Sequence, residues 1–271
     1  MVLVQAQDLA RELTHENPPL VLDARYNLRG RDGHEEYRDG HVPGAIWVDM
    51  DHELAGPAGE QGRHPLPDPA VFEAAMRRVG LSGGRPVVVC DGGSTLGAAR
   101  LWWMLRDAGH ESVRVLDGGF AAWRAAGLSV ATGDVEPGIA GDFTSRPGQR
   151  SRVDVADVAA GRCQVVDVRA PERYRGEVEP IDPVAGHIPG AVNLPAARSF
   201  ADGRFRPAAE LAELFADIPA GAAFSCGSGI TAAQSLLAME VAGRSDGALY
   251  PGSWSEWIAD PSRPIATGPD A

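Results

Sequence analysis

The chain has 271 residues, which is enough for one large domain or two domains of about 130 residues each. It is 44% hydrophobic and 23% charged, the composition of a globular protein with a buried core. Its net charge of −12 argues against nucleic acid as a partner. The charged N-terminal stretch does not resemble a signal peptide, and no run of about 18 apolar residues predicts a membrane span. We therefore expect a cytoplasmic protein.

The predicted elements alternate between short apolar runs and helical stretches. We expect strands at 20–24, 87–91, 113–116, 164–168, 222–225 and 247–250, and helices at 69–79, 96–108, 120–126, 208–216 and 231–242. Such an alternation predicts an α/β fold with a mostly parallel sheet flanked by helices.

Four sequence blocks occur twice, in the same order. Along the chain the pairs are "VLDAR" (21–25) with "VVDVR" (165–169), "GHVPGAI" (40–46) with "GHIPGAV" (186–192), "VVVCDGGSTLGAA" (87–99) with "AAFSCGSGITAA" (222–233), and "LDGGFAAW" (116–123) with "LYPGSWSEW" (249–257). Matched blocks in one order predict two copies of a single domain. We expect an N-terminal domain at 1–132, a Gly- and Pro-rich linker at 133–150 and a C-terminal domain at 151–271.

A lone cysteine, Cys226, ends a predicted strand of the second copy and precedes a glycine-rich turn. The residues that lead from it into the next helix are Gly227, Ser228, Gly229, Ile230 and Thr231. Glycines allow backbone N–H groups to turn toward one point, and a helix N-terminus adds partial positive charge. Both effects stabilise a thiolate, and ligands of open α/β sheets bind at the carboxyl ends of strands. We predict that Cys226 is a nucleophile rather than a small buried hydrophobic residue.

Other chemistries are less consistent with this loop. A cysteine phosphatase needs an arginine six residues after the nucleophile, where this chain has Ala232, and a nucleotide-binding loop needs a Lys-Ser/Thr pair that is absent. A cysteine hydrolase needs a histidine base, for which His41 or His187 would be available.

The remaining cysteines and histidines suggest no further centre. Cys90 and Cys163 lie in or beside apolar strands, so we interpret both as structural, reduced thiols. His52, Glu53 and His64 lie in a Gly- and Pro-rich stretch without the spacing of metal ligands. We therefore predict no metal site.

The tandem repeat, the two "GH[VI]PGA" blocks and "CGSGITAA" resemble the two-domain sulfurtransferases, rhodanese and 3-mercaptopyruvate sulfurtransferase, over the whole chain. The resemblance implies an inactive first domain, with Asp91 in place of the cysteine, and a catalytic second domain. It implies that Cys226 takes sulfur from a small donor as a persulfide, cradled by the N–H groups of residues 227–231. The sulfur would pass to cyanide, a thiol or a thioredoxin-like protein. The resemblance further implies a monomer that needs no cofactor, metal, nucleic acid or membrane.

The resemblance also assigns roles to side chains. Ser228 would act with His41 and Asp32 of the first domain, and Arg173 would bind the anionic end of the donor. The family's second arginine should follow nine residues after Arg173, where this chain has Asp182. An alternative for His41 is a structural role, because His187 occupies the same place in the second repeat.

Two donors and one non-catalytic role remain open. The uncharged Gly227 and Ser228 after the cysteine favour 3-mercaptopyruvate, whereas the missing second arginine favours thiosulfate. The third possibility is a sulfur-relay or partner-binding module without catalysis. The retained cysteine and loop glycines argue against it.

Overall fold

A computed structural model describes residues 2–27 and 30–269, which form two compact units. Unit 1 comprises Met1–Ala55 and Pro67–Arg150, and unit 2 comprises Gly56–Leu66 and Ser151–Ala271. The structure describes no helix that is long and apolar enough to span a membrane.

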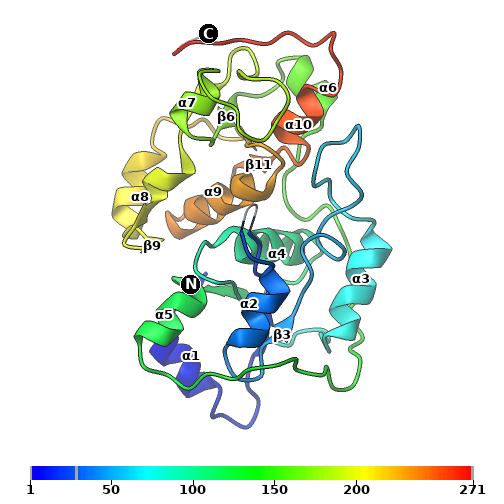
Figure 1. The fold of residues 1–271 in the computed structure, drawn as a ribbon, viewed down its shortest axis with the longest axis vertical. Coiled ribbons are helices and arrows are strands. Elements are labelled where there is room, and N and C mark those ends of the chain that lie inside the picture. The colour runs from blue at the N-terminus through cyan, green and yellow to red at the C-terminus, as the bar shows by residue number, and fades with distance from the viewer. Residues whose placement is uncertain (1, 28–29, 270–271) are drawn as a thin grey trace. The chain divides into compact units, whose positions relative to one another are not determined.

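Unit 1 is an α/β unit (Figure 1). Its elements are β1 (Leu3–Val4), α1 (Ala6–Glu12), β2 (Leu20–Asp23), α2 (Gly33–Asp39), β3 (Ile46–Trp47), α3 (Pro69–Arg78), β4 (Val87–Cys90), α4 (Leu96–Asp107), β5 (Val113–Leu116) and α5 (Gly119–Ala125). Among the described residues, the strands form one parallel sheet in the order β1-β5-β4-β2-β3. All residues of β2 and β4 are buried, as expected for central parallel strands covered on both faces.

Unit 2 repeats this plan. Its elements are α6 (Val155–Ala159), β6 (Val165–Asp167), α7 (Pro171–Tyr174), β7 (Val192–Asn193), the 3₁₀ helix η1 (Ala196–Ser199), β8 (Phe200–Ala201), β9 (Arg204–Phe205), α8 (Ala208–Leu214), β10 (Ala223–Ser225), α9 (Ile230–Val241), β11 (Ala248–Leu249) and α10 (Ser253–Trp257). In the described part of the unit, a parallel sheet has the order β11-β10-β6-β7, and β8 and β9 form an antiparallel pair.

The predicted fold class is confirmed: each unit is α/β, with a mostly parallel sheet and flanking helices. Every predicted strand and helix is present. The elements that the sequence pattern missed are β1, β3, β7, β8, β9, α1, α2, α6, α7, η1 and α10. Most of them span one or two turns or a pair of strand residues, which is too short for a clear hydrophobic period.

Two connecting segments are placed differently from the predicted boundaries. Residues 56–66 belong to unit 2, although they precede most of unit 1 in the sequence. The predicted linker at 133–150 belongs to unit 1, where Phe143 is buried and its N–H donates to Leu81 O at 3.1 Å. Each segment also bonds its backbone to the unit that it joins: Gly141 N–H donates to Arg77 O at 2.8 Å, and Arg63 N–H donates to Ser255 Oγ at 3.0 Å.

A buried ion pair explains why the "VLDAR" and "VVDVR" blocks recur. In unit 1 the Arg25 guanidinium bonds the Asp23 carboxylate, and its Nη2 donates to Gly40 O at 2.7 Å. Arg169 repeats the arrangement in unit 2, with its Nη2 2.7 Å from Gly186 O. A buried charge is stable only when it is paired and hydrogen-bonded, so each arginine ties the end of a strand to the "GH[VI]PGA" block.

The loop after β4 is closed by a side-chain carboxylate. Asp91 is buried and accepts hydrogen bonds from Gly93 N at 2.8 Å, Thr95 N at 3.1 Å, Ala98 N at 3.5 Å and Ser94 Oγ at 3.3 Å. Burial raises the pKa of Asp91, and these hydrogen bonds offset only part of that effect. The loop of unit 1 therefore keeps an internal acceptor for its converging N–H groups.

Replacing Asp91 tests this role. Asp91→Ala leaves buried N–H groups without their acceptor, and we expect a loss of about 1–3 kcal/mol in the free energy of unfolding. Guanidinium unfolding followed by tryptophan fluorescence measures it, with the exposed Glu16→Gln as the control. An Asp91→Ala transition that coincides with that of the wild type would show that the carboxylate is not needed.

Candidate active site

The sheet of unit 2 places Cys226 at its carboxyl edge. β10 ends at Ser225, which pairs with Asp167 at the end of β6, and Cys226 is the next residue. Gly229 adopts a left-handed conformation (φ +81°) and lets the chain turn directly into α9 at Ile230. The cysteine is 2% exposed, so its sulfur lies within the loop rather than on the surface.

Backbone groups surround the cysteine. The Gly229 N–H lies 3.1 Å from Cys226 Sγ and donates to it, and it is one of the groups from which the resemblance implies a backbone cradle. The loop is hydrogen-bonded to α10: Trp254 N donates to Cys226 O and Ser255 N donates to Gly227 O, each at 3.0 Å. The sulfur therefore faces a donor whose position is set by packing rather than by a mobile side chain.

The loop serine, Ser228, contacts a histidine that the sequence analysis did not select. Ser228 Oγ lies 2.8 Å from Nδ1 of His64, and Ser228 is 6% exposed. His64 comes from the segment 56–66, which belongs to unit 2 and lies beside α10 in Figure 1. The contact therefore joins a hydroxyl two residues after Cys226 to an imidazole from another segment.

His41, to which the resemblance assigns a role with Ser228, makes local contacts in unit 1. Its Nδ1–H donates to Tyr37 O at 2.9 Å, and its ring stacks on Tyr37 with centroids 4.1 Å apart. His187 makes the same contacts in unit 2, at 2.7 Å and 3.7 Å from Tyr174. Both histidines are fully buried. We interpret this duplicated arrangement as structural and assign the contact with Ser228 to His64 instead.

Asp32 also has a local role. It is the N-cap of α2, and its carboxylate accepts a hydrogen bond from Glu35 N at 3.0 Å. Capping of this kind stabilises the first turn of a helix. This contact gives Asp32 a structural role in unit 1, and its action with Ser228 stays a prediction.

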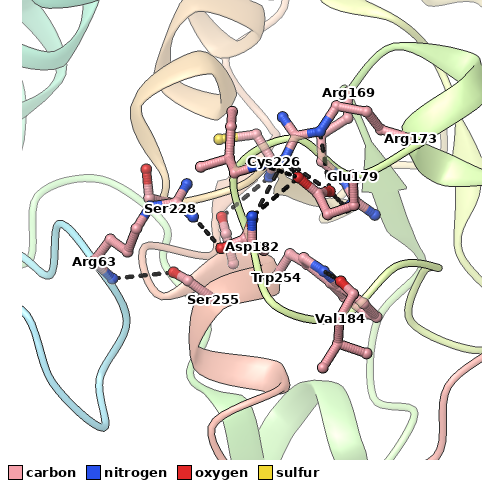
Figure 2. Close-up of polar contacts among 12 residues, drawn as sticks. Arg63, Arg169, Arg173, Glu179, Asp182, Val184, Cys226, Ser228, Trp254 and Ser255 are labelled. Atoms are coloured by element: carbon pink, nitrogen blue, oxygen red, sulfur yellow. Dashed lines mark hydrogen bonds and ion pairs between the residues drawn. The ribbon is translucent and has the colours of Figure 1, made fainter. Parts of the chain in front are cut away.

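Arg173 and Arg63 lie against the loop (Figure 2). Arg173 bonds both carboxylate oxygens of Glu179, at 2.7 and 2.9 Å, and reaches Asp182 at 3.3 Å. Arg63 forms an ion pair with the other oxygen of Asp182. A Cβ atom placed on Gly227 would lie 2.8 Å from Arg63 Nη2 and 3.6 Å from Arg173 Nη2. Two guanidinium groups thus border the residue next to the cysteine.

The two carboxylates of this cluster differ in their electrostatics. Burial opposes ionisation of Glu179, but hydrogen bonds from Arg173 and from two backbone N–H groups outweigh it and hold its pKa below the usual range. Burial raises the pKa of Asp182, although Arg63 and Arg173 act in the opposite direction. Asp182 is therefore the less well stabilised of the two anions.

The remaining predicted residues lie at the start of α9 or in the cores. Ile230 is buried as the first residue of α9, and Thr231 is partly buried behind it. Cys90 is fully buried, and burial raises the pKa of its thiol well above the usual value. Within residues 2–27 and 30–269, no group of three His, Cys, Asp or Glu side chains is arranged to hold a metal ion.

Comparison with known proteins gives the family. The model of the rhodanese-like domain matches residues 5–126 and again 155–260. A protein named as a thiosulfate sulfurtransferase, SseB of Mycobacterium tuberculosis, is 44% identical over 98% of this chain and 97% of its own. A protein of Pseudomonas aeruginosa named as a 3-mercaptopyruvate sulfurtransferase is 43% identical over 98% of each chain.

A solved structure of a sulfurtransferase has the same fold. The crystal structure of SseA from Escherichia coli, a 3-mercaptopyruvate sulfotransferase by its description, superposes with a TM-score of 0.81 at 34% identity, covering 94% of this chain and 99% of that one. Two rhodanese-like domains, of which only the second has a cysteine at the loop position, define a sulfurtransferase. The chain belongs to the rhodanese family, and the predicted two-domain sulfurtransferase is confirmed.

Gly229 provides a test of the loop geometry. A Cβ atom on Gly229 would lie 2.3 Å from Pro251 O, whereas Gly221, with a similar φ of +76°, has open space around it. We expect Gly221→Ala to cost about 1–2 kcal/mol through its left-handed backbone alone. Gly229→Ala should cost about 1–3 kcal/mol more, because the methyl group overpacks the loop. Equal unfolding midpoints for the two variants would contradict the close packing of the loop.

Proposed function

We propose that the protein transfers sulfur from 3-mercaptopyruvate, through a persulfide on Cys226, to a thiol or cyanide acceptor. The observation that carries this choice is the 2.8 Å contact between Ser228 Oγ and His64 Nδ1 within the cysteine loop. A hydroxyl and an imidazole at this place provide a proton donor, and 3-mercaptopyruvate is a donor whose reaction needs one.

The first half-reaction moves one sulfur atom. The Cys226 thiolate attacks the thiol sulfur of 3-mercaptopyruvate, an S–S bond forms, and the C–S bond breaks. The electron pair of that bond passes to the departing group, which leaves as the enolate of pyruvate and takes up a proton to become pyruvate. In this proposal His64 Nδ1–H donates to Ser228 Oγ, and the serine O–H delivers the proton to the enolate. The Gly229 N–H, which donates to Cys226 Sγ, supports the negative charge on sulfur.

The second half-reaction restores the enzyme. A thiolate or cyanide attacks the outer sulfur, and the S–S bond to Cys226 breaks with its electron pair returning to the cysteine. The products are a persulfide or thiocyanate and the free Cys226 thiolate, so no external oxidant or reductant is required. Such a cycle needs a reduced cysteine, in keeping with a cytoplasmic setting.

Thiosulfate is the second candidate donor. Two guanidinium groups beside Gly227 suit a compact dianion, and the relative from Mycobacterium tuberculosis is named for thiosulfate. In this reaction the leaving group is sulfite, which departs as a stable anion without being protonated. The two donors therefore differ in their need for the Ser228–His64 pair.

Mass spectrometry and donor kinetics test the proposal. Exposure to 3-mercaptopyruvate should add about 32 Da, one persulfide sulfur, to the intact chain, and Cys226→Ser should gain nothing and lose all turnover. We expect the ratio kcat/KM to favour 3-mercaptopyruvate over thiosulfate by about tenfold or more. A tenfold preference for thiosulfate would reverse the donor assignment, and no mass increase with either donor would leave a non-catalytic module.

The proton relay makes a separate prediction. Ser228→Ala and His64→Gln should each lower kcat with 3-mercaptopyruvate by about 10²-fold or more, because the enolate loses its proton donor. With thiosulfate the loss should stay within about tenfold. His41→Gln is the matched control, and it should affect stability more than the choice of donor. Equal losses with both donors in the Ser228 and His64 variants would exclude the relay.

A further inference from the structure

Asp182 lies between two guanidinium groups beside the cysteine loop. One oxygen pairs with Arg63, and the other lies 3.3 Å from Arg173 Nη2 (Figure 2). Its side chain is 2% exposed, against 27% for Arg63 and 16% for Arg173. A Cβ atom placed on Gly227 would lie 3.7 Å from its Oδ2. The Asp182 carboxylate thus lies between the guanidinium groups of Arg63 and Arg173, next to the proposed nucleophile.

The two other carboxylates near the loop, Glu179 and Asp167, are each held by several hydrogen bonds. Glu179 receives two hydrogen bonds from Arg173 Nη2 and a further one from its Nε, and it also accepts from the N–H groups of Ile181 and Asp182. Asp167 is held by the guanidinium of Arg169. Neither can leave without abandoning several hydrogen bonds.

Asp182 is held differently. Among the described residues its carboxylate contacts the two arginines, and burial raises its pKa. Arg63 has further donor capacity, because its Nε is buried and has no hydrogen-bond partner among the described residues. A second anion could therefore bind Arg63 and Arg173 in place of the Asp182 carboxylate, with an additional N–H available to it.

We propose that Arg63 and Arg173 together form the binding site for the donor's anionic group, and that Asp182 is an internal competitor which the donor displaces. Asp182 then sets the affinity for the donor, because it pairs with Arg63 and contacts Arg173 in the free enzyme and each donor must replace it. Arg63, from the segment 56–66, supplies the second guanidinium that the sequence lacks after Arg173. This inference rests on the proposed function for the identity of the donor.

Binding of a non-reacting carboxylate tests the site without turnover. Pyruvate, titrated by calorimetry, should bind Asp182→Asn about tenfold more tightly than the wild type, because the neutral amide no longer competes for the arginines. Arg63→Gln should bind it about tenfold more weakly. The exposed pair Arg175 and Glu177 gives matched controls in the same unit, Arg175→Gln and Glu177→Gln, with unchanged affinity.

Steady-state kinetics provide the second measurement. With 3-mercaptopyruvate, Asp182→Asn should lower KM by about tenfold and Arg63→Gln should raise it by a similar factor, while kcat stays within about twofold. Arg63→Lys keeps the charge without the planar fork, and its KM should lie between those of wild type and Arg63→Gln. This conservative variant also serves if Arg63→Gln proves unstable.

The outcomes separate the two proposals. Unchanged or weaker pyruvate binding in Asp182→Asn, or wild-type binding in the Arg63 variants, would overturn the competitor role. The expected pyruvate affinities without a persulfide on Cys226 would support the anion site and refute sulfur transfer. A persulfide on the wild type, together with pyruvate affinities that are unchanged in the Asp182 and Arg63 variants, would support sulfur transfer and refute the anion site.

Discussion

The structure depends on one constraint: a strand that turns directly into a helix through a tight loop directs N–H groups at a point that needs an acceptor. In unit 1 that acceptor is the Asp91 carboxylate, which four donors of its own loop hold in place. In unit 2 it is the Cys226 sulfur, which accepts from Gly229 N–H. The same backbone thus produces a closed structural loop when the acceptor is a carboxylate, and the proposed reactive site when it is a sulfur atom that can form a new bond.

The buried carboxylates differ in how firmly their partners hold them. The Asp23–Arg25 and Arg169–Asp167 pairs join strand ends to the "GH[VI]PGA" blocks, and each has backbone partners that keep it in place. Asp182 has no comparable support, since its carboxylate is held by two arginines beside the loop. Removing a buried carboxylate from its arginines is unfavourable unless another anion takes its place. In the proposed donor site, the affinity for a donor therefore reflects a difference between two anions rather than the strength of one ion pair.

Much of the fold and part of the site could be predicted from the residues themselves. The repeated blocks predicted two α/β domains, and the glycine loop before a helix predicted the nucleophile. The residues missed were Arg63 and His64, in a stretch without periodicity. One signal was available: the offset between the copies falls from 146 residues at the "GH[VI]PGA" blocks to 135 at the loops. The first copy therefore holds 11 extra residues in this interval, the length of the segment 56–66, although the offset does not show where they fold.

The sequence by itself determined the family and the domain duplication and predicted the reactive cysteine, because these depend on local patterns: hydrophobic period, turn residues and the order of repeated blocks. Only the tertiary structure decided which histidine meets Ser228. The sequence favoured His41 and did not single out His64 for this role, but His41 is stacked on Tyr37 and bonded to its carbonyl, while the segment that carries His64 joins the other unit. That choice depends on which backbone and side-chain groups each segment can satisfy in three dimensions, and this information is not contained in the spacing of residues along the chain.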